Sequence, residues 1–162
     1  MKKHLKYLTT DIVFQEVPNE VSLAIDITGC PHKCEGCHSN MLWKDVGDIL
    51  INDLDNLIAP YSNLITCVCF MGGDQNMTEL ISLCRKVQIK YNLKTCVYSG
   101  CNDVSIFKEC ITYLDYLKIG SYVKKLGGLD SSTTNQKFYK IENGYELTDI
   151  TNYFQIKKMN NT

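Results

Sequence analysis

The segment at positions 29–38 reads Gly29-Cys30-Pro31-His32-Lys33-Cys34-Glu35-Gly36-Cys37-His38 and directly follows a short apolar run. Its cysteines have the spacing Cys-x3-Cys-x2-Cys. Three thiolates in so tight a loop can hold three irons of a cubane, whereas a self-sufficient [4Fe-4S] cluster takes four cysteine ligands. The fourth iron is then open to a substrate, and the best-known such ligand is S-adenosylmethionine (SAM), a source of radical chemistry.

A structural zinc site is the main alternative for this loop. Zinc takes four ligands, usually as two separated pairs of side chains. His32 or His38 could supply the fourth ligand, but both lie inside the same short loop and would be strained in that role. A zinc site and a chance grouping of free thiols both stay open at this point.

Around the loop, strand-like and helix-like segments alternate along the chain. This alternation indicates right-handed βα units and a parallel sheet. A closed eight-fold barrel needs about 250 residues, so this chain of 162 residues can build only part of one. We expect strands at 21–27, 64–71, 93–98 and 114–119, and helices at 52–59, at 77–91 behind an Asn76 cap with Glu79 in the capping box, and at 103–111.

The pattern changes after residue 119. Residues 127–137 are rich in glycine, serine and threonine, which predicts a loop. Residues 138–148 carry Asn143-Gly144 between two strand-like runs, which is the strongest short signal for a β-hairpin. We therefore expect an α/β fold that ends in a hairpin.

Several motifs lie where the predicted parallel strands end, which is where α/β folds gather their functional groups. The cysteine loop follows the first strand, Gly72-Gly73-Asp74 follows the second, and Ser99-Gly100 follows the third. A glycine pair alone often marks only a turn. Here the glycines would let the backbone approach a ligand, and the Asp74 carboxylate could pair with the ammonium group of SAM. A partial barrel leaves one side open, where a protein could dock.

Composition excludes several classes of function. The net charge is -1 and 22% of the residues are charged, which gives no signature of nucleic-acid or membrane binding. No apolar stretch approaches the roughly 20 residues of a membrane span, and the basic start of the chain is not followed by an apolar region. We expect one domain over residues 1–162, in the cytoplasm.

Nine cysteines would suggest disulfides in a secreted protein, but the odd count argues against them. A second cluster would need four of the remaining six to converge, and they show no Cys-x2-Cys spacing. We expect them to pack as small apolar side chains, with Cys101 as the one to watch for reactivity. These six are Cys67, Cys69, Cys84, Cys96, Cys101 and Cys110.

Longer stretches of the chain resemble a known family. The triplet with Asp74 resembles the signature of the radical SAM superfamily. The loop, with Trp43 six residues past its last cysteine, resembles more closely the activating proteins of anaerobic (class III) ribonucleotide reductase. Three more segments carry the same resemblance, which extends from about Tyr7 to Ile141: Val97-Tyr98-Ser99-Gly100, Leu114 to Tyr122, and Gly127 to Lys137. The chain departs from the usual pattern at Ser39-Asn40, Gln75 and Ile119.

The resemblance implies a partial, open (βα) barrel of the radical SAM type and a defined chemistry. A reduced [4Fe-4S] cluster on Cys30, Cys34 and Cys37 cleaves SAM to methionine and a 5′-deoxyadenosyl radical. That radical takes a hydrogen atom from a glycine of anaerobic ribonucleoside-triphosphate reductase. A low-potential donor such as flavodoxin or ferredoxin supplies the electron. The implied SAM contacts are Gly36, Cys37, His38, Gly72, Gly73, Asp74 and Ser99, and the implied docking residues are Asn135, Gln136 and Lys137.

Two other functions remain as alternatives. One is activation of another glycyl radical enzyme, as in the pyruvate formate-lyase activating family, although those chains are usually longer and often carry extra cluster domains. The other is a metal-binding module without catalysis.

Overall fold

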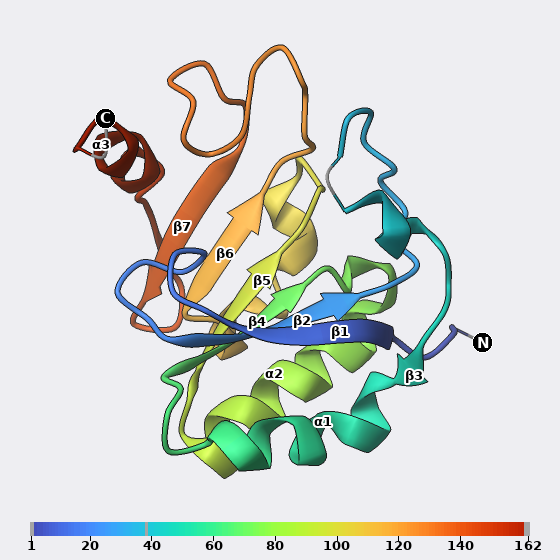
Figure 1. Ribbon diagram of the computed structural model, residues 1–162. Helices are drawn as coiled ribbons and strands as arrows, with labels where there is room; N and C mark the ends of the chain where they lie inside the picture. Colours follow the sequence, from blue (N-terminus) through green and yellow to red (C-terminus); the bar gives the residue numbers. More distant parts are fainter. Residues whose placement is uncertain (1, 38, 161–162) are drawn as a thin grey trace.

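The computed structural model describes residues 2–37 and 39–160, whose strands form one mixed, open sheet with the order β3-β1-β2-β4-β5-β6-β7-β8 (Figure 1). The four central strands β2, β4, β5 and β6 are parallel, and antiparallel strands flank them on both sides. The strands are β1 (Lys6–Val13), β2 (Ser22–Ile27), β3 (Asp48–Ile49), β4 (Cys67–Met71), β5 (Lys94–Tyr98), β6 (Tyr116–Ile119), β7 (Lys137–Glu142) and β8 (Glu146–Asp149).

The parallel strands are buried because helices or loops cover both faces of the sheet. Helices α1 (Leu50–Ile58) and α2 (Met77–Tyr91) lie together on one face (Figure 1). Helix α1 presents Leu50, Leu54 and Ile58, one per turn, to the larger apolar core. The other face carries a smaller core around Phe138, which Phe154 of helix α3 (Asn152–Asn160) joins with a ring-centroid distance of 5.0 Å.

The predicted Asn76 cap of α2 is confirmed, but the capping box is not formed, because the Asn76 backbone N–H donates to the Gly73 carbonyl at 3.1 Å and not to Glu79. The Asn76 side chain accepts a hydrogen bond from the Glu79 backbone N–H at 3.2 Å, and Asn92 ends the helix in the left-handed conformation at φ 52°. The Glu79 carboxylate accepts from the Leu5 backbone N–H at 3.2 Å, and this contact ties the segment before β1 to the start of α2.

The predicted helix at 103–111 is wrong. Two 3-10 helices, Val104–Phe107 and Ile111–Tyr113, take its place. The Asp103 side chain accepts from the Ser105 backbone N–H at 2.9 Å and closes a tight turn at the start. Phe107 and Cys110 are the fully buried residues of this stretch, and their spacing of three residues matches the period of a 3-10 helix.

The hairpin predicted around Asn143-Gly144 is present as β7 and β8. Both turn residues have positive φ, 57° and 77°, as a type I′ turn requires. The partial-barrel architecture stays a prediction. Three further 3-10 helices are short: Asn40–Trp43, Ala59–Tyr61 and Asp74–Asn76. Within the described residues, no helix is long and apolar enough to cross a bilayer.

Candidate functional site

The cysteine loop leaves the end of β2 and is closed at its base by backbone hydrogen bonds. Gly29 N–H donates to the Lys44 carbonyl and Cys30 N–H donates to the Leu42 carbonyl, both at 3.0 Å. Within the loop, Cys37 N–H donates to the Cys34 carbonyl at 3.1 Å. All three cysteines are half-buried free thiols, and all three line one cavity of about 360 Å³.

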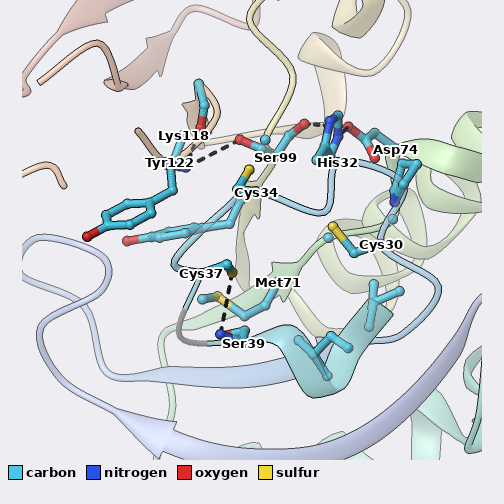
Figure 2. A pocket seen from close by; sticks show the side chains of 18 of the residues that line it. Cys30, His32, Cys34, Cys37, Ser39, Met71, Asp74, Ser99, Lys118 and Tyr122 are labelled. Atoms are coloured by element: carbon cyan, nitrogen blue, oxygen red, sulfur yellow. Dashed lines mark hydrogen bonds and ion pairs between the residues drawn. The ribbon is translucent and has the colours of Figure 1, made fainter. Parts of the chain in front are cut away.

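The same cavity collects the motifs that follow the next two strands (Figure 2). Gly72, Gly73 and Asp74 come from the end of β4, and Ser99 comes from the end of β5. A Cβ on Gly73, whose φ is +111°, would lie 3.1 Å from Leu80 Cδ1 and 3.2 Å from Ile27 Cδ1. This position therefore needs glycine for its backbone conformation and for its space.

Two of the expected site residues do not join this arrangement. Gly36 does not line the cavity; a Cβ there would meet the Lys124 and Tyr122 side chains at 3.5 and 3.6 Å, so the cysteine loop packs against the 120–128 segment at this point. His38 lies outside the described residues.

Asp74 connects the cysteine loop to the strand ends. Its side chain is 4% exposed, and Oδ2 accepts hydrogen bonds from His32 Nε2 at 2.7 Å and from Ser99 Oγ (Figure 2). The His32 ring also packs on Gly100. His32 thus connects the cysteine loop to the ends of β4 and β5 through its contacts with Asp74 and Gly100. The sequence did not suggest this role.

Gln75 makes a second connection between the β4 end and the cysteine loop. Its Nε2 donates to the Thr28 carbonyl at 2.8 Å, just before the loop begins. A proline at this position could not make this side-chain hydrogen bond. The departure from the family pattern at Gln75 therefore has a structural role in this chain.

Lys118 of β6 is a cavity residue that sequence reasoning missed. It is 8% exposed, and its ammonium donates to the Gly120 carbonyl at 2.9 Å and to the Ser99 carbonyl at 3.4 Å. Burial lowers the pKa of Lys118 to about 8, while negative charge on Cys34, Cys37 and Cys30 acts in the opposite direction. A lysine inside the otherwise apolar run Tyr116–Ile119 was the signal that could have revealed it.

The segment after β6 forms another wall of the cavity through Gly120, Tyr122, Leu129 and Gln136. Gln136 is buried, with Nε2 3.4 Å from the Gly120 carbonyl, and Asn135 Nδ2 donates to the Ser121 carbonyl at 3.0 Å. Lys137 is exposed and pairs with Asp149 at 3.5 Å. Gln136 therefore forms part of the cavity wall, while Asn135 bonds to the neighbouring backbone, and the role of both in docking stays a prediction.

The donor set fits a three-cysteine cluster. Cys30, Cys34 and Cys37 are the only cysteines among the residues that line the cavity. In the described part of the chain, no three His, Cys, Asp or Glu side chains converge on a point that could hold a single metal ion. Each thiolate of a cubane binds a separate iron, so three thiols that line one cavity are enough donors for three irons of a cluster.

The other cysteines serve as packing groups, as predicted. Five of them are completely buried in the two cores, and burial raises the thiol pKa of Cys67, Cys84 and Cys96 above its usual range. Such thiols stay protonated and are poor metal ligands. Cys101 is half-buried in the loop that follows β5.

Comparisons with known proteins agree with this geometry. The family model described as a 4Fe-4S single cluster domain matches residues 21–152, which include all the cavity residues named above. The chain is 30% identical over 109 residues to the anaerobic ribonucleoside-triphosphate reductase-activating protein of Enterobacteria phage T4. This alignment covers 62% of the chain and 70% of the phage protein. No solved structure matches the chain significantly.

Proposed function

Because the chain belongs to the 4Fe-4S single cluster domain family and to the anaerobic ribonucleoside-triphosphate reductase-activating proteins, we propose that it is a radical SAM activase. It cleaves SAM reductively and generates a glycyl radical on an anaerobic ribonucleoside-triphosphate reductase. One observation carries the proposal: the three cysteines of the loop share a cavity with the glycine-glycine-aspartate turn after β4.

The three thiols of the loop would hold three irons of a [4Fe-4S] cluster and leave the fourth iron open for SAM. When bound and reduced, the cluster supplies one electron that breaks the sulfur–C5′ bond of SAM, giving methionine and a 5′-deoxyadenosyl radical. That radical then takes a hydrogen atom from the target glycine of the reductase. His32 and Gln75 hold the loop against the strand ends, so they orient the thiols toward the cavity.

Charge in the cavity complements the amino-acid part of SAM, which carries an ammonium and a carboxylate. Asp74 offers a buried carboxylate to the ammonium. Lys118 offers a buried ammonium to the carboxylate; two of its three N–H donors are used by backbone carbonyls. A cavity of about 360 Å³ lies within the size range of small-molecule sites, roughly 300–1,000 Å³.

The sheet is, in this proposal, the partial, open (βα) barrel of the radical SAM type. Its support is the set of four parallel strands whose carboxyl ends carry the cavity. The reductase has to bring its glycine to the cavity, so it contacts the surrounding loops, with Asn135, Gln136 and Lys137 as the proposed docking segment. A cytoplasmic flavodoxin or ferredoxin supplies the electron.

Anaerobic reconstitution tests the proposal. The chain should take up about four irons and four sulfides. With dithionite and SAM it should release methionine and 5′-deoxyadenosine, and with the reductase it should give the electron paramagnetic resonance signal of a glycyl radical. A pyruvate formate-lyase is the matched control partner. Radical formation on that partner in place of the reductase would overturn the assignment of the target. Reduced, iron-loaded protein that leaves SAM intact would overturn the proposed reductive cleavage of SAM.

A further inference from the structure

A second cavity, of about 420 Å³, adjoins the first. The two cavities share Cys30, Pro31 and Gln75, so these residues form the wall between them. One of the three proposed cluster ligands therefore lies against both cavities. Electron transfer slows steeply with distance, and a proposed cluster ligand, Cys30, lines the second cavity as well as the first.

The lining of this second cavity is basic. Lys2, Lys3, Lys33 and His4 line it, against Asp45 as its one carboxylate. The positive charge is local to this cavity, since the whole chain has a net charge of -1. We call these five residues and their cavity the basic hollow.

Two of these four basic side chains pair with no carboxylate in the described part of the chain. Asp45 lies 3.5 Å from Lys3 and also 3.6 Å from Lys6. Lys2 and Lys33 are exposed and pair with no carboxylate among the described residues. The His4 ring lies 3.3 Å from Glu79. Exposed lysines without a carboxylate partner attract an acidic protein surface and raise the rate at which that protein binds.

We infer that the basic hollow is the docking site of an acidic electron-donor protein, which delivers its electron to the cluster past Cys30. The inference rests on the proposed function. In each transfer the reduced centre of the donor loses one electron and the cluster gains it, with no other reactant. SAM and the reductase occupy the first cavity and its rim, so a donor on the basic hollow does not compete with them.

Charge reversal at two exposed lysines tests this surface. Lys2→Glu/Lys3→Glu changes the net charge by the same amount as the matched control Lys157→Glu/Lys158→Glu on α3, and neither pair lies in the cysteine loop. The probe is a purified acidic flavodoxin, titrated into the cluster-loaded chain by calorimetry at low ionic strength. We expect Kd to rise about tenfold or more for the first variant and to change less than about twofold for the control. Added salt should weaken binding to the wild-type chain.

Two reductants separate this inference from the proposed function. Flavodoxin-driven SAM cleavage should fall in the Lys2→Glu/Lys3→Glu variant, while cleavage driven by dithionite, which needs no docking, should stay at the wild-type rate. An unchanged Kd for flavodoxin overturns the inference, as does a variant that loses affinity for the reductase instead. No cleavage with dithionite in the wild-type chain would contradict the proposed function, and the binding titration would still decide the docking site.

Discussion

Gly100→Ala is a direct test of how the cysteine loop is held. A Cβ at this position would lie 2.8 Å from His32 Cγ and 2.9 Å from His32 Cδ2. Ordinary contacts begin at 3.4 Å, so the ring has to retreat by about 0.6 Å. Gly100 is not among the glycines with positive φ, so the backbone itself tolerates alanine and the cost arises from the ring.

The expected loss of stability depends on the hydrogen bond that the His32 ring makes to Asp74. Overpacking a tight site costs about 1–3 kcal/mol. The ring cannot retreat freely, because Nε2 is 2.7 Å from the buried Asp74 carboxylate. Moving it weakens this hydrogen bond or displaces the loop that carries Cys30 and Cys34. We therefore expect the free energy of unfolding of the cluster-free chain to fall by about 1–3 kcal/mol, and reconstituted iron to fall with it.

Urea denaturation under reducing conditions measures the free energy of unfolding. Gly128→Ala is the matched control, because its nearest neighbours would be at 3.8 and 3.9 Å, and it should change stability by less than about 0.5 kcal/mol. The same Gly100→Ala change in a His32→Ala background should cost less than half as much, since only Cβ of residue 32, at 3.0 Å, remains to be met. Equal costs in both backgrounds would refute the reasoning.

Three further predictions concern the first cavity. Asp74→Asn should weaken SAM binding, measured per bound cluster, by about 1.5–3 kcal/mol, the range of a hydrogen bond to a charged group; unaltered SAM affinity per cluster would limit Asp74 to its bonds with His32 and Ser99. Cys34→Ala should abolish SAM cleavage, whereas Cys84→Ala should lower only thermal stability, and an active Cys34→Ala chain would exclude the cluster assignment. Replacing Asn135 and Gln136 by alanine should lower glycyl radical yield; an equal loss of SAM cleavage without the reductase would show that this segment serves the active site instead of docking.

The sequence predicted the parts of the structure that local chemistry decides. The Asn76 cap, the Asn143-Gly144 turn and the buried cysteines each follow from the nearest few residues, and the structure contains all of them. The shared cavity also follows from sequence, because parallel strands deliver their carboxyl ends to one edge of a sheet.

Other features depend on partners far away in the chain. Strand β1 has no run of buried residues and forms by pairing with β2, so its own pattern gave no clear signal. Helix α3 buries no residue completely, and it is positioned by the contact of Phe154 with Phe138. The bond between His32 and Asp74 joins residues 42 positions apart, which spacing within the loop does not reveal.

The central claim is that three loop cysteines hold a cluster that cleaves SAM. It is tested most directly by incubating the anaerobically reconstituted, dithionite-reduced chain with SAM and measuring 5′-deoxyadenosine by chromatography, with Cys30→Ala, Cys34→Ala and Cys37→Ala as controls. We predict 5′-deoxyadenosine and methionine in equal amounts from the wild-type chain and none from the three variants. A native protein that contains zinc and no iron, or product formation that survives the loss of any one of these cysteines, would contradict the claim.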